Sequence, residues 1–208
     1  MPGDCRRFCV MTTGRSGSSS LMMALQVHDD IAVPSKQIGP GSNELLRPRD
    51  LAKHRRAYSD RLGAPIGDAG ALIEAFYRHS SAAAFAGFKS MPHRHADYAD
   101  FVARPDIRFI TLVRADLAST VASFMLAMRR GTWIRQGGTP LERWDFRPED
   151  TRQARGILAR LRRNLHALEA LPSAIRLTYE DLCDPAYSSE ELEGFFGRRI
   201  RIEKPQPP

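Results

Sequence analysis

Short apolar runs alternate along the chain with longer segments whose apolar residues recur every three or four positions. The short runs predict buried β-strands, and the longer segments predict amphipathic helices. The expected strands are 7–12, 31–34, 84–88, 107–113 and 174–178. The expected helices are 18–28, 47–62, 68–81, 96–103, 117–130 and 148–171, followed by a short closing helix. This alternation predicts an α/β fold in which a central parallel sheet of about four to five strands is flanked by helices.

Three segments do not follow this pattern. Residues 36–43 (KQIGPGSN) are rich in glycine, proline and polar side chains, and residues 132–148 combine both tryptophans with a Gly-Gly pair. The tail at 202–208 contains three prolines, so it cannot continue a helix. Because long connections in a compact α/β domain often carry function, we expect 36–43 and 132–148 to be flexible and to flank the substrate site. We expect 202–208 to be a flexible, frayed end.

The composition is typical of one globular domain that spans residues 1–208. Of the 208 residues, 42% are hydrophobic and 26% are charged, which is ordinary for a folded domain. The formal net charge is +7 and is carried mostly by arginine, which predicts ligands that bear several negative charges. Nucleic acid would satisfy the same charge, but the chain has no helix-turn-helix, zinc-finger or RNP motif. We therefore expect no nucleic-acid partner.

Cysteine usage and hydropathy indicate the compartment. The three cysteines, Cys5, Cys9 and Cys183, form neither a paired framework nor a C-x-x-C spacing, which favours a reducing environment and predicts no metal site. No run of about 18 apolar residues is present, and a strand-like run begins within a few residues of Met1,. We therefore expect a cytoplasmic protein without a signal peptide or a stable membrane anchor.

The segment that follows the first expected strand carries the strongest chemical signal. It consists of Gly14, Arg15, Ser16, Gly17, Ser18, Ser19 and Ser20 and leads into a helical pattern. Glycine lets the backbone approach a ligand closely, and the serines supply hydroxyl groups and the amides of a first helical turn. This arrangement predicts a site for a phosphate or sulfate group. A serine-rich turn that only caps a helix is the alternative interpretation.

The same loop lacks the lysine of a nucleotide-binding P-loop. A Walker A motif reads G-x-x-x-x-G-K-[ST], whereas the cation here is Arg15, near the start of the loop. None of the expected strands ends in an aspartate that could hold Mg²⁺. An ordinary ATPase or GTPase is therefore not expected.

Four further motifs accompany this loop. They are N-E-L-L at 43–46, F-K-S-M-P at 88–92, F-I-T-L-V-R at 109–114 with Ser123 nine residues after Arg114, and T-Y-E-D-L at 178–182. Together with R-S-G-S-S at 15–19, they resemble sulfotransferases that use 3′-phosphoadenosine-5′-phosphosulfate (PAPS). The pattern is most similar to that of the bacterial enzymes directed at carbohydrates and trehalose. The resemblance implies a P-loop-like α/β fold of three layers.

The resemblance also implies a donor site. The backbone amides and hydroxyl groups of Ser16–Ser20, including Gly17, would bind the 5′-phosphate of PAPS. Arg15 and Lys89 would neutralise the sulfuryl and bridging oxygens during transfer. Arg114 and Ser123 would bind the 3′-phosphate, because a dianion suits a two-pronged donor and a converging hydroxyl group. Tyr179 would approach the nucleotide.

A general base is implied on the acceptor side. In the trehalose-directed enzymes a glutamate takes this role, and Glu44 occupies the corresponding place in the N-E-L-L motif. Cytosolic sulfotransferases use a histidine within the K-T-H-L-P motif. Here Ser90 and Met91 stand between Lys89 and Pro92, so this histidine has no counterpart. His93 and His95 follow directly, so either could serve as the second candidate base. No metal would be required.

The function implied is transfer of a sulfuryl group from PAPS to a hydroxyl group of a carbohydrate or another small-molecule acceptor. A P-loop-like nucleotide kinase with a degenerate loop is one alternative. A non-catalytic protein that binds anionic ligands or RNA through the same fold is another. Because the chain is short for the resembled family, a homodimer that completes a shallow acceptor site is also an expectation.

Overall fold

A computed structural model describes residues 5–39, 43–131, 147–184 and 186–200 of the chain. The expected flexible segment 202–208 lies outside the described residues, as does 132–148 except for its last two positions. No helix within the described ranges combines the length and the apolar character needed to cross a membrane.

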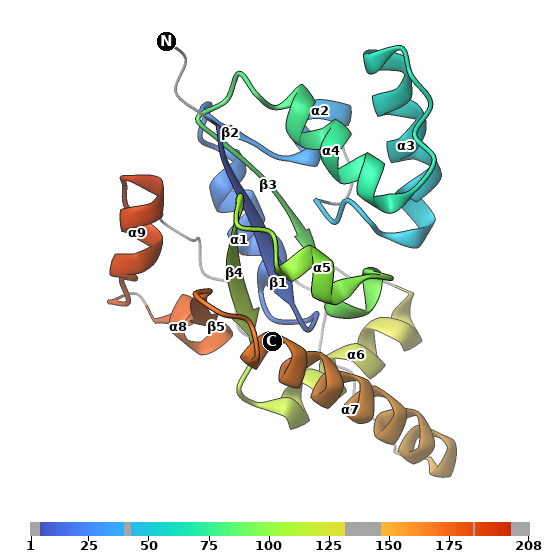
Figure 1. Ribbon diagram of the computed structural model, residues 1–208. Helices are drawn as coiled ribbons and strands as arrows, with labels where there is room; N and C mark the ends of the chain where they lie inside the picture. The colour runs from blue at the N-terminus through green and yellow to red at the C-terminus, as the bar shows by residue number, and fades with distance from the viewer. Residues whose placement is uncertain (1–4, 40–42, 132–146, 185, 201–208) are drawn as a thin grey trace.

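Five parallel strands form one central sheet in the order β2-β3-β1-β4-β5. The strands are β1 (Arg6–Thr12), β2 (Ile31–Ala32), β3 (Phe85–Ser90), β4 (Ile107–Val113) and β5 (Ile175–Thr178). Strand β1 lies at the centre, where Cys9 pairs with Phe88 of β3 on one side and with Phe109 of β4 on the other. Helices flank the sheet (Figure 1). The α/β fold with a central parallel sheet is therefore confirmed.

The two faces of β1 enter two separate hydrophobic cores, as the alternation of a strand requires. Cys9 and Met11 belong to the core shared with α3, α4, α5 and α7. Phe8 and Val10 belong to the core shared with α1, α8 and α9. A Cβ atom on Gly87 would lie 2.3 Å from the ring of Phe8, so only glycine fits beside this ring. Both faces of β1 are therefore covered, as is usual for a strand in a parallel sheet.

The helices are distributed over the two faces and one end of the sheet (Figure 1). On the first face lie α3 (Pro48–Leu62), α4 (Ala69–His79), α5 (Tyr98–Val102) and α7 (Pro148–Glu169). On the second lie α1 (Ser18–Gln26), α8 (Tyr179–Cys183) and α9 (Glu190–Phe196). Helix α6 (Leu117–Arg130) packs against α7 through a small cluster that includes Phe124 and Leu161.

Part of the segment 36–43 differs from the expected flexible connection, since residues 36–38 are helical, whereas residues 40–42 lie outside the described residues. Helix α2 (Pro34–Ile38) begins with proline at its first turn and ends at Gly39, whose φ is 84°. Proline fits a first helical turn, and glycine tolerates a positive φ at the end. The side chain of Gln37 accepts a hydrogen bond from Tyr58 and donates one to Ser80. These contacts to α3 and the end of α4 stabilise a helix that is too short to persist alone.

Two other boundaries differ from expectation for similar reasons. Strand β2 contains only Ile31 and Ala32 rather than four residues, because Pro34 begins α2. Part of the helix expected at 96–103 is α5, preceded by a 3₁₀ turn, η1 (Pro92–Arg94), which also begins with proline. Both prolines fix φ near the helical value and lack the amide that a strand would use.

Candidate functional site

The expected site residues gather at the carboxyl ends of the parallel strands. In a parallel sheet these ends share one edge, and ligands bind where the connections from neighbouring strands diverge to opposite sides. Here that point lies between β1 and β4, because β2 and β3 lie on one side of β1 and β4 and β5 on the other. The strand arrows point toward the end of the molecule where α6 and α7 lie (Figure 1).

The loop between β1 and α1 turns through three residues with positive φ. The φ values are 85° at Gly14, 56° at Arg15 and 75° at Gly17. Gly17 is the N-cap of α1, and no side chain caps this helix end. The first turn of α1 contains no acidic residue either. An uncapped helix N-terminus carries open amides and a partial positive charge, so the loop suits an anion.

Hydrogen bonds within the loop hold its shape. The hydroxyl groups of Thr12 and Ser16 form a short hydrogen bond, and Thr12 Oγ1 accepts the amide of Gly14 at 3.1 Å. Ser16 and Ser18 are buried, whereas Ser19 is exposed and Ser20 is partly buried. The structure therefore places all the expected phosphate-loop residues at the sheet edge.

Two arginines from neighbouring strand ends lie close together beside this loop. Arg15 Nε donates to Ser123 Oγ at 2.9 Å. This hydrogen bond connects the loop after β1 with α6. The guanidinium of Arg114, just beyond β4, lies 4.6 Å from the centre of the Tyr179 ring. Burial lowers the pKa of Arg15, and the positive charge of Arg114 lowers it further. Two like charges held together favour an anion between them.

The two residues of the expected pair, Arg114 and Ser123, have different neighbours. Ser123 contacts Arg15, and the Nε atom of Arg114 is buried with no hydrogen-bond partner among the described residues. A buried guanidinium nitrogen without an acceptor is costly unless a ligand supplies one. The guanidinium of Arg114 therefore suits an anionic group such as a phosphate, since arginine binds phosphate in a two-pronged manner.

Tyr179 forms a wall of the same site. A Cβ atom on Gly17 would lie 2.8 Å from Tyr179 Cδ2, so the ring packs directly on the loop. Burial raises the pKa of Tyr179, and a hydrogen bond with the Cys183 thiol raises it further. Thr178 caps α8 by accepting the amide of Asp181 at 3.0 Å. The T-Y-E-D-L motif therefore both ends β5 and positions an aromatic ring beside the loop.

Lys89 connects the phosphate loop with Glu44. Its Nζ atom donates to Ser19 Oγ at 3.1 Å, and its backbone amide donates to the Asn43 carbonyl oxygen at 2.8 Å. Glu44 thereby forms a parallel β-bridge with Lys89. Burial lowers the pKa of Lys89, the Glu44 carboxylate opposes this shift, and Arg47 adds to it. A cation and a carboxylate from distant segments thus meet next to the loop.

The side chain of Glu44 is only 7% exposed and forms an ion pair with Arg94, whose Nε lies 3.1 Å from Glu44 Oε1. This pairing holds the carboxylate in a fixed orientation beside Lys89. Sequence reasoning did not select Arg94. It lies 50 positions from Glu44, and its only local signal is that it follows directly after His93 in a polar segment.

The two candidate histidines have different surroundings. His95 Nε2 lies 2.8 Å from Ser90 Oγ, and its ring stacks on Phe101 with centroids 4.0 Å apart. Burial lowers the pKa of His95 to about 4, so it is neutral at neutral pH and packed as a structural residue. His93 is exposed, and its Nδ1 lies 3.2 Å from Asn164 Nδ2. Of the two, His93 alone can reach a substrate from solvent.

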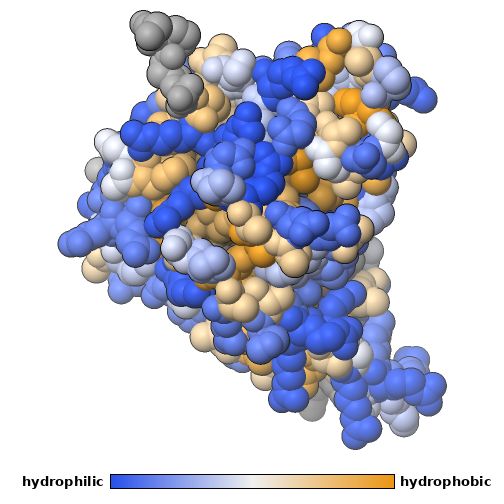
Figure 2. All heavy atoms as spheres, in the orientation of Figure 1, coloured by the Kyte–Doolittle hydropathy of each residue, from blue (hydrophilic) through white to orange (hydrophobic). Residues whose placement is uncertain are grey.

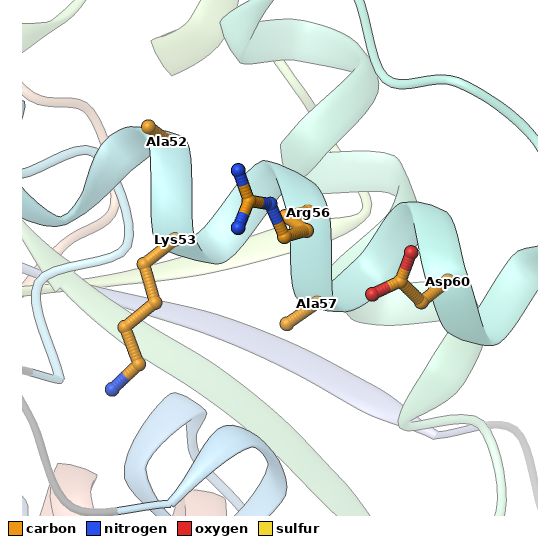
Figure 3. A pocket seen from close by; sticks show the side chains of 5 residues that line it. All are labelled: Ala52, Lys53, Arg56, Ala57 and Asp60. Atoms are coloured by element: carbon orange, nitrogen blue, oxygen red, sulfur yellow. The ribbon is translucent and has the colours of Figure 1, made fainter.

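One surface hollow lies away from this site. It has a volume of about 430 Å³ and is lined by Ala52, Lys53, Arg56, Ala57 and Asp60 (Figure 3). All five residues come from one helix, α3, and none belongs to the site described above. The hollow is therefore an open helix face. Among the residues that the structure describes, no group of three or more His, Cys, Asp or Glu side chains could hold a metal ion.

No protein-family model matches the chain, and no curated protein matches it significantly.

Proposed function

We propose that the chain is a sulfotransferase that moves a sulfuryl group from PAPS to a hydroxyl group of a carbohydrate or another small molecule. One observation carries the proposal. Arg15, Lys89 and Arg114 come from the ends of three adjacent strands and surround a loop with an uncapped helix N-terminus. A donor with phosphates at both its 5′ and 3′ positions needs this number of cations in one place.

The donor site can be assigned residue by residue. The amides at the start of α1 and the hydroxyl groups of Ser16–Ser20 bind the 5′-phosphate. The guanidinium of Arg114 binds the 3′-phosphate, and the Tyr179 ring fixes the plane of this guanidinium. Ser123 orients Arg15 through the bond to its Nε, and the guanidinium of Arg15 binds the sulfuryl end of the donor.

When bound, PAPS supplies a sulfuryl group whose bond to a phosphate oxygen breaks as the acceptor attacks. Arg15 and Lys89 stabilise the negative charge that develops on the oxygens, since an arginine stays protonated and donates hydrogen bonds without losing a proton. Glu44 accepts the proton of the acceptor hydroxyl group, and His93 is the second candidate. Sulfuryl transfer resembles phosphoryl transfer in that positioning and charge stabilisation supply most of the catalysis.

Thermal unfolding in the presence of three ligands tests the proposal. 3′-Phosphoadenosine-5′-phosphate (PAP), the product of the donor, should raise Tm in the presence of a metal chelator, because binding to the folded state stabilises it by mass action. Arg15→Gln should reduce the shift, whereas Arg152→Gln, an exposed position on α7, should not.

The same measurement separates the alternatives. A shift with ATP that requires Mg²⁺ would support a nucleotide kinase. A shift with a short RNA alone would support a binding protein. Either result without a PAP shift contradicts the proposed function.

A further inference from the structure

One face of α7 brings a second set of polar side chains to the candidate site. Arg160 and Asn164 lie one helical turn apart and therefore share a face. Asn164, which is buried, contacts His93 of η1 at 3.2 Å. The guanidinium of Arg160 lies 5.4 Å from the centre of the Phe124 ring on α6. Arg160 thus contacts α6 directly, and its neighbour Asn164 on the same face contacts η1.

His93, Arg94 and Arg160 are here called the acceptor-side cluster, and its positive charge comes from the two arginines. Burial lowers the pKa of His93, and the charges of Arg94 and Arg160 lower it further. Both arginines are therefore near its ring. Arg94 uses its Nε to bind Glu44, which leaves its terminal nitrogens as further donors. Within the described part of the chain, no carboxylate pairs with Arg160.

The acceptor-side cluster borders the phosphate loop by two routes. A Cβ atom on Gly14 would lie 2.9 Å from Phe124 Cζ, so the ring under Arg160 packs on the loop. On the other route, Arg94 binds Glu44, which bridges to Lys89. The surface around α7 is largely hydrophilic (Figure 2). The cluster is thus next to the proposed base but separate from the three cations of the donor site.

We propose that the acceptor carries a negatively charged group, a carboxylate, phosphate or sulfate, that binds to Arg160 and to the free end of Arg94. This inference rests on the proposed function, because it assigns the second substrate of the same site. Excess positive charge near an apolar ring focuses the field and favours an anion. With the anion held at Arg160, a hydroxyl group elsewhere on the acceptor can approach Glu44. Arg160 is then a specificity-determining residue of the acceptor site.

Binding of methyl phosphate to the PAP-saturated protein tests this inference. PAP occupies the donor site, so the titration measures binding of methyl phosphate to the acceptor site alone. Calorimetric titration at constant ionic strength should show one methyl phosphate site. Arg160→Gln should weaken this binding about 10- to 100-fold, as expected for loss of a charged hydrogen-bond partner. Affinity for PAP should stay within about twofold of wild type, since donors to PAP lie elsewhere.

Arg162→Gln is the matched control. Arg162 is exposed on the same helix. Because it lies two residues after Arg160, its side chain points to nearly the opposite side of the helix. This variant removes the same charge and should bind methyl phosphate as wild type does. The inference is overturned if methyl phosphate does not bind to the PAP complex, or if Arg160→Gln and Arg162→Gln weaken it equally.

Failure of the proposed function gives a different result. In that case PAP does not bind, and the titration is made without it. A difference between Arg160→Gln and Arg162→Gln would then still identify an anion site at α7, although not an acceptor site. If Arg160→Gln and Arg162→Gln bind methyl phosphate equally, the proposed anion site at α7 is refuted as well.

Discussion

The contact between Gly17 and Tyr179 makes a quantitative prediction about the phosphate loop. Gly17 has a φ of 75°, and a Cβ atom there would lie 2.8 Å from Tyr179 Cδ2. In Gly17→Ala the left-handed backbone costs about 1–2 kcal/mol, and displacing the packed ring costs about 1–3 kcal/mol more. The expected loss of unfolding free energy is therefore about 2–5 kcal/mol.

Gly63 provides a matched control. Its φ is 64°, and nothing lies within 4 Å of a Cβ atom placed there. Gly63→Ala should therefore pay only the backbone cost of about 1–2 kcal/mol. For a chain of this size each kcal/mol lowers Tm by about 2–4 °C. The difference between the two variants isolates the contact with Tyr179.

Urea unfolding and calorimetric titration with PAP measure the two consequences. Gly17→Ala should be less stable than Gly63→Ala and should bind PAP about tenfold more weakly than wild type, because the ring and the loop amides shift together. Gly63→Ala should bind PAP as wild type does. Equal stability and equal PAP affinity in the two variants would refute the packing of Tyr179 on the loop and its part in the donor site.

Three further predictions concern individual side chains. Arg114→Gln should weaken PAP binding about 10- to 100-fold and change stability little, because its buried Nε has no described partner to lose,; Arg152→Gln serves as the control in calorimetry. Glu44→Gln should lower turnover while PAP affinity stays near wild type. If Glu44→Gln is fully active, the general base is His93 instead of Glu44. The depressed pKa of His95, about 4, means that the unfolded chain binds a proton below about pH 6.5 while the folded chain does not. His95 should therefore contribute a fall in stability of about 3 kcal/mol between pH 6.5 and pH 4, and urea unfolding of His95→Asn should show a pH dependence that is smaller by this amount.

Local patterns made most of the fold predictable. The apolar run of β1, the glycines of the loop and the apolar face of α1 agree with one another, and their structure depends on neighbours in sequence. Helix α2 was not predictable in this way. Its stability comes from bonds between Gln37 and two residues of distant elements, Tyr58 and Ser80.

The candidate site was predictable in outline because parallel strands bring their carboxyl ends to one edge. The hydrogen-bond partners within the site were not predictable. Ser123 binds Arg15 across 108 positions, and Arg94 binds Glu44 across 50. Nothing local in the sequence signals either partner. The stacking of His95 on a buried phenylalanine is likewise a property of packing, and only the structure separates this histidine from His93.

The most direct test of the donor site compares PAP with adenosine 5′-monophosphate, which lacks the 3′-phosphate. Both titrations are made by calorimetry in the presence of a metal chelator, on wild type and on Arg114→Gln. The account predicts that wild type binds PAP at least about tenfold more tightly than the monophosphate, and that Arg114→Gln abolishes most of this difference. Equal affinity of wild type for the two nucleotides would contradict the proposed donor site.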